Sequence, residues 1–240
     1  MATSLNYIAF GWYPYVALTV FLLGSLIRFD REQYTWRSGS SQLLRRKQLR
    51  WGSNLFHVGI LVIFVGHAAG LLLPVAFFEM LGITKTAKQL MAIIVGGIAG
   101  IACLIGILLL AHRRLFDARI RATSSFGDTA ILLLLLAQLL LGLATIPLSL
   151  GHLDGQEMVK FMNWAQGIVT LQPGASAYVL DVHPIFRAHL FLGMTIFLVF
   201  PFSRLVHIWS APIWYVGRRG YQVVRSAHPQ GRRAAARMQH

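Results

Sequence analysis

Five long stretches without an acidic or basic side chain recur along this chain, apart from Arg204 near the end of the last, and they constrain its fold. About 20 apolar residues in a helix cross a hydrocarbon core about 30 Å thick. Because lipid offers no water to backbone groups, a spanning segment is a helix or part of a closed barrel, and continuous apolarity without two-residue alternation excludes the barrel. The sequence therefore predicts an all-α integral membrane protein, a bundle of five transmembrane helices at about 8–27, 54–78, 90–111, 129–150 and 188–209.

The composition agrees with a membrane location. Of 240 residues, 56% are hydrophobic and 12% are charged, whereas soluble domains are about 45–50% apolar. The formal net charge of +14 would suggest nucleic-acid binding in a soluble chain. Here the charges lie between the apolar stretches, and no basic patch is interleaved with aromatic residues. We therefore expect membrane lipid, and no nucleic acid, around this chain.

The basic residues alternate between the connections and so predict the orientation. Since connections rich in Lys and Arg stay in the cytoplasm, the N-terminus is expected outside and the C-terminus in the cytoplasm. We expect a membrane domain over 1–217 and a basic cytoplasmic tail over 218–240, which contacts either lipid headgroups or a partner. The Lys and Arg counts are seven in 28–50, two in 74–89, four in 112–127, one in 151–186 and six after 209.

Four histidines lie inside the predicted spans, where an ionisable side chain is costly and indicates function. His57 and His67 are on the second span, and His189 and His207 on the fifth. Because these two spans are antiparallel, His57 should meet His207 and His67 should meet His189. Two imidazoles from facing helices are the arrangement that holds a six-coordinate b-type haem. The alternatives are hydrogen bonding between helices, a proton relay or metal transport.

The predicted haems are non-covalent, and their spacing requires an irregular helix. The single cysteine, Cys103, lies in an apolar stretch, so there is no Cys-x-x-Cys-His attachment motif. The histidines of the fifth span are 18 residues apart, about 27 Å of helix, whereas those of the second are ten apart, about 15 Å. Two straight parallel helices cannot match both intervals. Either the helices tilt or the fifth bends at Pro201.

Small and charged residues surround the histidines. Gly66 and Gly70 flank His67 and allow either a second helix or a flat macrocycle to approach closely. Gly59 and Gly193 offer the same choice. The basic residues near the histidine pairs, Arg187 and Arg204, could either form ion pairs with haem propionates or extend to lipid headgroups. His152 and His183 lie outside the spans and are rival ligands for the outer haem.

Lys85 and Lys88 lie in an otherwise lightly charged outer connection, close to the predicted outer pair. A lysine ammonium there can donate a hydrogen bond to a quinone carbonyl. The alternative is an ordinary interfacial lysine.

A haem pair also needs an electron acceptor, and because the chain has no soluble domain, that acceptor would be a cytoplasmic protein.

Several motifs make the chain resemble a known family over nearly its whole length, to about residue 215. That family is the gamma, or cytochrome b, subunit of membrane-bound respiratory nitrate reductase. The matching motifs are YPY at 13–15, QYTWR at 33–37, SNLFHVGI at 53–60, FVGH at 64–67, RRLF at 113–116, RAT at 121–123, DG at 154–155, WAQ at 164–166 and FPFSRLVHIWS at 200–210.

The resemblance implies a quinol-oxidising electron-transfer subunit in the bacterial cytoplasmic (inner) membrane. Such a subunit oxidises ubiquinol or menaquinol at the periplasmic side. Two b haems then pass electrons to an iron–sulfur beta subunit and on to a molybdenum-containing alpha subunit that reduces nitrate, which supports the proton-motive force.

By motif position, the resemblance also implies roles for individual residues. The proximal, cytoplasmic haem falls on His57 and His207, and the distal, periplasmic haem on His67 and His189. The lysine of the family's quinol site corresponds to Lys88, and Gly66 and His67 belong to the same site. The connection 74–89 departs from the family pattern, so Lys85 is an alternative to Lys88. Two other readings stay open: a similar anchor in a heterodisulfide-reductase-like complex, and a haem-free anchor or transporter.

Overall fold

The computed structural model describes residues 2–36, 44 and 46–210, and within these ranges every regular element is a helix. The expected tail over 218–240 lies outside the described residues. Five helical segments are long and apolar enough to cross a membrane, which confirms the all-α membrane prediction. They are Thr3–Thr35, Lys47–Leu72, Lys85–Phe116, Phe126–Leu150 and Pro184–Phe202.

The first spanning segment is built from several helical pieces. Helix α1 (Ala2–Tyr7) continues through a π-helical turn, η1 (Ile8–Trp12), into α2 (Tyr13–Glu32), and a 3-10 turn, η2 (Gln33–Thr35), follows. Pro14, the second residue of α2, has no N–H to donate to the π-helical turn before it, and the Phe10 carbonyl of that turn accepts from Trp164 Nε1. The segment is therefore helical for longer than the uncharged stretch predicts.

The second spanning helix, α3 (Arg46–Leu72), ends six residues before the predicted limit at 78. Pro74 has an extended backbone with ψ of 157° and begins a separate short helix, α4 (Val75–Met80). Proline donates no backbone hydrogen bond and disfavours helical geometry in the residue before it. Apolarity alone does not reveal this break.

The third and fourth spanning helices begin with side-chain caps. Helix α5 (Lys85–Phe116) is capped by Thr84, whose Oγ1 accepts from the Ala87 N–H at 3.2 Å. A short helix, α6 (Ala118–Ala122), follows, and then α7 (Phe126–Leu150), whose cap Ser125 accepts from the Asp128 N–H at 3.1 Å. Such caps satisfy the first N–H groups of a helix.

The connection after α7 contains a short helix, α8 (Gln156–Val169), followed by η3 (Ala175–Val179). Trp164 Nε1 donates to the Phe10 carbonyl at 2.9 Å, and Gln166 Nε2 donates to the Leu71 carbonyl at 3.0 Å. These bonds fix α8 against the start of the chain and the end of α3.

The fifth spanning segment bends, and its α-helix is shorter than predicted. Helix α9 (Pro184–Val199) stops two residues before Pro201, and two 3-10 turns follow, η4 (Phe200–Phe202) and η5 (Arg204–Ile208). The predicted span over 188–209 is therefore α-helical only as far as Val199. Of the two alternatives, tilted helices or a bend at Pro201, the structure shows the break at proline.

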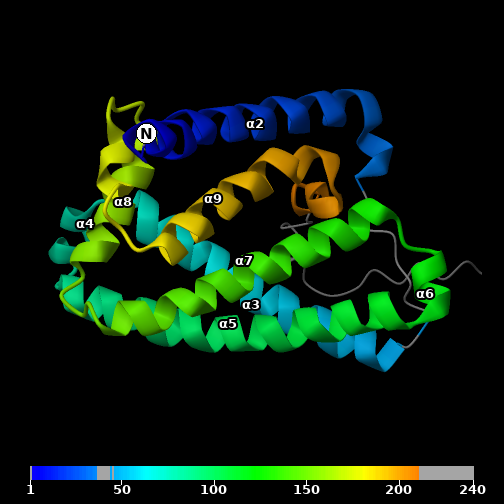
Figure 1. The fold of residues 1–240 in the computed structure, drawn as a ribbon. Helices are drawn as coiled ribbons and strands as arrows, with labels where there is room; N and C mark the ends of the chain where they lie inside the picture. Colours follow the sequence, from blue (N-terminus) through cyan, green and yellow to red (C-terminus); the bar gives the residue numbers. More distant parts are fainter. Residues whose placement is uncertain (1, 37–43, 45, 211–240) are drawn as a thin grey trace, which may run out of the picture. The chain divides into compact units, whose positions relative to one another are not determined.

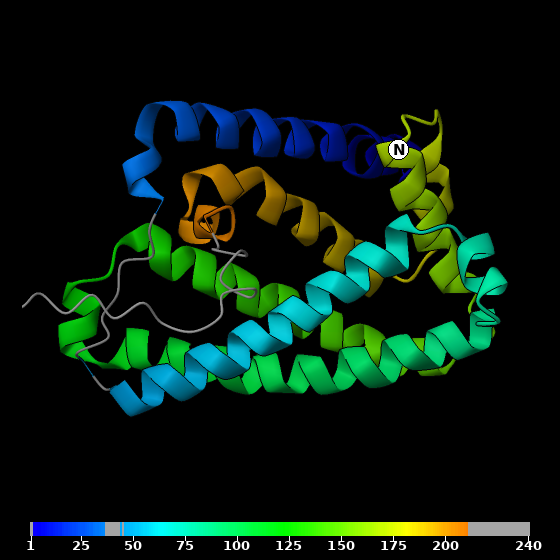
Figure 2. The same ribbon diagram turned by 180° about the vertical axis from the view of Figure 1, so that it is seen from behind.

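The helices pack in the order α3, α5, α7, α9, α2, with α8 against α3 (Figures 1 and 2). Helices α4 and α8 lie at one end of the molecule, here named the α8 end, and α6 lies at the other, named the α6 end (Figure 1). Helices α3 and α9, which bear histidines, do not pack mainly on each other: α3 packs mainly on α5, and α9 packs mainly on α2 and α7.

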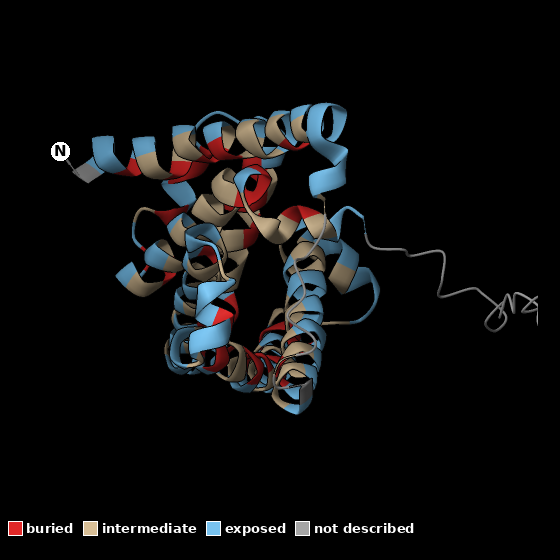
Figure 3. Cartoon of the chain, turned by 90° about the vertical axis from the view of Figure 1, so that its right-hand side faces the viewer, coloured by how far each residue is buried: buried red, intermediate tan, exposed pale blue. Residues whose placement is uncertain are grey.

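Much of the helix surface is apolar and exposed, and buried residues gather where helices meet (Figure 3). One buried cluster, around Phe10, Trp164 and Val179, lies at the α8 end. A second, around Cys103, Ile107 and Leu139, joins α5 to α7. Exposed Ile98 and Val65 exemplify the apolar surface that lipid covers in a membrane protein.

Candidate functional site

The structure brings the four membrane histidines together in two pairs. The ring centroids of His57 on α3 and His207 on η5 are 6.4 Å apart, with an interplanar angle of 69°. Those of His67 on α3 and His189 on α9 are 6.1 Å apart, with an angle of 52°. Each pair therefore joins two separate elements of the bundle.

The bend after α9 resolves the spacing conflict seen in the sequence. In a straight helix, His207 would lie about 27 Å from His189, too far for partners only ten residues apart on α3. Because α9 stops at Val199 and the chain continues in 3-10 turns, His207 still meets His57.

Three of the four imidazoles have a fixed ring orientation. Nδ1 of His57 donates to the Ser53 carbonyl at 2.7 Å, Nδ1 of His67 to the Ile63 carbonyl at 2.8 Å, and Nδ1 of His207 to the Arg204 carbonyl at 2.6 Å. In a neutral imidazole that carries its proton on Nδ1, the lone pair lies on Nε2. Nε2 is the atom that would coordinate a metal ion in this tautomer, and the hydrogen bond from Nδ1 strengthens it as a ligand.

His189 is held in a different way. Its Nδ1 is buried and has no hydrogen-bond partner among the described residues. The ring lies over Gly142 of α7, where an added Cβ would be 3.0 Å from Cε1. Gln138, one turn earlier on α7, donates from Nε2 to the His189 carbonyl at 3.1 Å. Packing and a backbone contact therefore position this ring.

The geometry of both pairs fits haem iron. An imidazole nitrogen lies about 2 Å from a bound metal and about 1.1 Å from its own ring centroid, so two rings on one iron have centroids about 6.3 Å apart. The observed 6.4 and 6.1 Å agree with that value. No group of three or more His, Cys, Asp or Glu that could hold a metal occurs among the described residues, so each pair offers two protein ligands.

The glycines near the histidines divide into packed and open positions. A Cβ on Gly59 would lie 2.7 Å from the Ala99 carbonyl oxygen, so this glycine serves the packing of α3 on α5. A Cβ added to Gly193 would lie 3.2 Å from Gln138 Nε2. A Cβ added to Gly66 or Gly70 would have no atom of the chain within 4 Å. The space beside His67 is therefore open to a flat group, as a macrocycle requires.

Lys88 lies close to the end of α3 at the α8 end of the molecule. Its Nζ donates to the Gly70 carbonyl at 2.8 Å, lies 2.8 Å from Met162 Sδ and stands 4.2 Å above the Phe78 ring centroid. The structure therefore brings Lys88 to Gly70, which lies one helical turn beyond Gly66 and His67 on α3. An ammonium has three N–H donors, and two acceptors leave one for a further ligand. Lys85 is partly exposed, and its backbone packs against Gly155.

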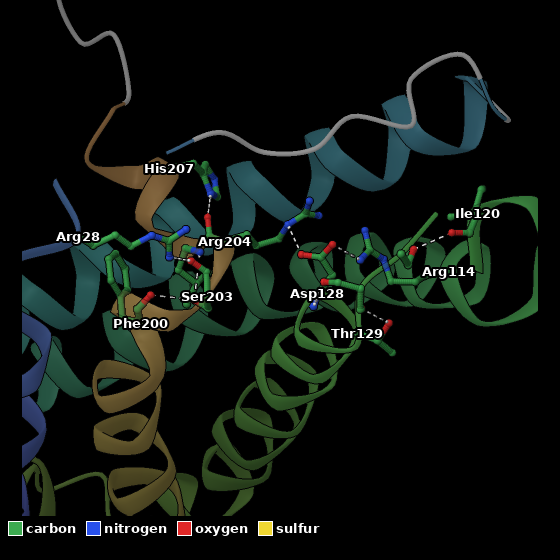
Figure 4. A network of polar contacts seen from close by, with 12 residues as sticks. Arg28, Arg114, Ile120, Asp128, Thr129, Phe200, Ser203, Arg204 and His207 are labelled. Atoms are coloured by element: carbon green, nitrogen blue, oxygen red, sulfur yellow. Dashed lines mark hydrogen bonds and ion pairs between the residues drawn. The ribbon is translucent and has the colours of Figure 1, made fainter. Parts of the chain in front are cut away.

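Three other candidate residues from the sequence have side-chain partners within the chain, whereas His152 is exposed. Arg187 Nη2 donates to Asn6 Oδ1 at 3.3 Å, and Arg204 Nε forms an ion pair of 2.9 Å with Asp128 Oδ1 (Figure 4). His183 caps α9, since its Nδ1 accepts from the Ile185 N–H at 3.3 Å.

Sequence reasoning missed three residues around the pairs: Gly142, Gln138 and Asp128. Gln138 is a polar interruption of a long leucine-rich run, and Asp128 is an acid just before that run. Both were visible signals. Nothing in the sequence marks Gly142, because its role depends on which residue of α9 crosses above it.

Comparison with known proteins shows which family the chain is similar to. The nitrate reductase gamma subunit family matches residues 6–227. The respiratory nitrate reductase 1 and 2 gamma chains of Escherichia coli are 54% and 52% identical to this chain; the alignments cover 93% and 94% of it and 99% of each relative. The nitrate reductase gamma chain of Bacillus subtilis is 40% identical over 91% of this chain and 97% of its own length.

These matches extend over nearly the whole chain. The relatives are bacterial respiratory subunits, and the five apolar helices are long enough for a multi-pass membrane protein. The chain therefore belongs to the nitrate reductase gamma subunit family, the membrane-anchored cytochrome b subunits of respiratory nitrate reductase.

Proposed function

We propose that this chain oxidises quinol and carries the electrons across the membrane through two non-covalent b haems. The observation that carries the proposal is the pair of ring separations, 6.4 and 6.1 Å, each suited to one iron between two histidines. His57 and His207 hold the proximal haem, and His67 and His189 hold the distal haem. When bound, each haem supplies a one-electron carrier.

Lys88 binds and orients the quinol beside the distal pair. Its remaining Nζ–H donates to a quinol oxygen, while its bonds to Gly70 and Met162 hold the ammonium in place. Gly66 keeps the neighbouring surface of α3 open. Oxidation of ubiquinol or menaquinol releases two electrons and two protons, and the protons leave on the side of the membrane where the quinol is bound.

The α8 end faces the periplasm of a bacterium, and the α6 end faces the cytoplasm, in the cytoplasmic (inner) membrane. The distribution of Lys and Arg supports this orientation. The connections at the α6 end, 28–50 and 112–127, contain seven and four, whereas those at the α8 end, 74–89 and 151–186, contain two and one. Quinol protons are then released outside, which supports the proton-motive force.

The electrons leave toward the cytoplasm through a partner protein. The relatives are named as gamma chains of nitrate reductase, which implies further chains in the same assembly. An iron–sulfur beta subunit accepts the electrons at the α6 end, and a molybdenum-containing alpha subunit reduces nitrate. The basic tail over 218–240 contacts lipid headgroups or one of these subunits.

The test is haem content and reduction in the purified complex. We expect two b haems per chain in pyridine haemochrome spectra, reduction of both by a quinol, and reoxidation by nitrate when the other subunits are present. A content of one haem per chain would mean that one of the two histidine pairs does not bind haem. The absence of haem would mean that the histidines serve helix packing or proton transfer instead. Co-purification of a cysteine-rich disulfide-handling subunit would contradict the nitrate assignment.

A further inference from the structure

The segment that presents His207 has no α-helical backbone to hold it. It consists of η4 and η5, two turns of three and five residues after the end of α9. Short 3-10 turns have poorer hydrogen-bond geometry than an α-helix. The position of His207 must therefore depend on contacts from other elements.

Two arginines provide such contacts at the α6 end (Figure 4). Arg28 on α2 donates from Nη1 to the carbonyls of Pro201 at 2.6 Å and Ser203 at 2.9 Å. Arg204, on η5 itself, forms the 2.9 Å ion pair with Asp128. The first contact holds the start of the turn, and the second holds the residue whose carbonyl accepts from His207.

Asp128 joins three elements of the bundle. It lies in the first turn of α7, and its carboxylate also pairs with Arg114 Nη1 of α5 at 3.5 Å. A carboxylate is favoured at this end of a helix, where the dipole is positive. The side chains of Asp128 and Arg204 are both only 24% exposed, so water screens their ion pair less than one on the surface.

A series of contacts connects Asp128 to the ring of His207 through Arg204. Asp128 holds the Arg204 side chain, and the Arg204 carbonyl accepts from His207 Nδ1 at 2.6 Å. We infer that Asp128 is a positioning residue for the proximal haem: through Arg204, it sets the place and orientation of the His207 ring. This inference depends on the proposed function, because it requires His207 to be a haem ligand.

Carbon monoxide binding to the reduced complex tests the inference. A six-coordinate iron with two histidine ligands has no open position for carbon monoxide, and loss of one ligand opens it. In the intact complex, we expect Asp128→Ala to make part of the proximal haem reactive toward carbon monoxide. His207→Ala sets the upper limit, about half of the total haem if both sites fill. Asp128→Asn, which keeps the shape but loses the charge, should fall between Asp128→Ala and the parent.

The matched control is Glu157→Gln at the α8 end. Glu157 forms a 2.6 Å ion pair with Lys160, its side chain is 22% exposed, and it lies apart from both histidine pairs. We expect this variant to leave carbon monoxide binding unchanged. Asp128→Glu, which restores the carboxylate, should recover most of the six-coordinate spectrum. A general loss of folding would instead affect both haems and would not respond to the restored charge.

The outcomes separate the inference from the proposed function. If His207→Ala opens a site for carbon monoxide but neither Asp128→Ala nor Asp128→Asn does, the positioning role is wrong and the ligand assignment stands. If His207→Ala itself leaves both haems bound and unreactive, the ligand assignment is wrong. An electron paramagnetic resonance signal shifted for the proximal haem alone in Asp128→Asn supports the inference, and equal shifts of both haems contradict it.

Discussion

The two histidine pairs have nearly the same ring separation, yet different forces hold them. At the α6 end, both rings donate from Nδ1 to backbone carbonyls, and ion pairs fix the segment that bears His207. At the α8 end, only His67 has such a bond, and His189 is positioned by its packing over Gly142. The irregular segment is held by polar contacts, whereas the regular helix α9 presents His189 through packing and one hydrogen bond to its backbone.

This difference has a practical consequence for the two sites. The proximal pair should respond to changes in charge around η5, as tested with Asp128. The distal pair should respond to changes in volume on α7, because a packed ring moves when its neighbour grows.

Removal of a ligand should have the largest effect, and it tests whether the pairs are independent. We expect His67→Ala or His189→Ala to abolish the distal haem and quinol oxidation while the proximal haem remains. His207→Ala should weaken only the proximal site. Pyridine haemochrome content per polypeptide and reduced-minus-oxidised spectra measure both. Loss of the proximal haem alone in His67→Ala would contradict the pairing.

Gly142→Ala should have the next largest effect and probes the packing of the distal pair. Its new Cβ would lie 3.0 Å from His189 Cε1, closer than ordinary contact, so the ring must shift. We expect partial loss of distal haem with the proximal haem intact, measured by the same spectra. The control is Gly97→Ala on α5, whose Cβ would lie 3.6 Å from Ile146 Cδ1, an ordinary contact. Equal behaviour of the two variants would argue against positioning by packing.

Substitution of Lys88 tests whether the distal end is the quinol site. Loss of a hydrogen bond from a charged donor costs about 1.5–3 kcal/mol, which is one to two powers of ten in affinity. We expect Lys88→Ala to weaken binding of a quinol analogue by about that factor without loss of haem. Fluorescence or spectral titration with the analogue measures the change. Lys85→Ala is the control, and if it weakens binding more than Lys88→Ala does, the roles of the two lysines must be exchanged.

The smallest effects should separate the packed from the open face of α3. Gly59→Ala places a Cβ against backbone atoms of α5, and overpacking of this kind destabilises by about 1–3 kcal/mol. Thermal unfolding in detergent should show the loss. Gly66→Ala meets no atom of the chain within 4 Å, so we expect unchanged folding but a perturbed distal haem spectrum. An unchanged spectrum in Gly66→Ala would mean that the open space is not haem space.

Part of this architecture was predictable because it depends on local chemistry. Uncharged stretches long enough to cross a membrane predict helices wherever the backbone has no water to bind. The proline at 201 predicts a bend because its ring is incompatible with the preceding helical turn. The proline at 74 acts in the same way, but the apolar residues around it hid the end of α3.

The uncharged stretches and the positions of the histidines suffice to predict a helical membrane protein with two pairs of histidines on antiparallel segments. How each ring is held depends on contacts between helices that are distant in the chain. Gly142 and His189 are 47 residues apart and Asp128 and Arg204 are 76 apart, so their contacts depend on how α7 lies against the last spanning segment. Hydrophobic periodicity specifies which face of a helix is buried, but the contacts across that face follow from crossing angles and bends that no local pattern encodes.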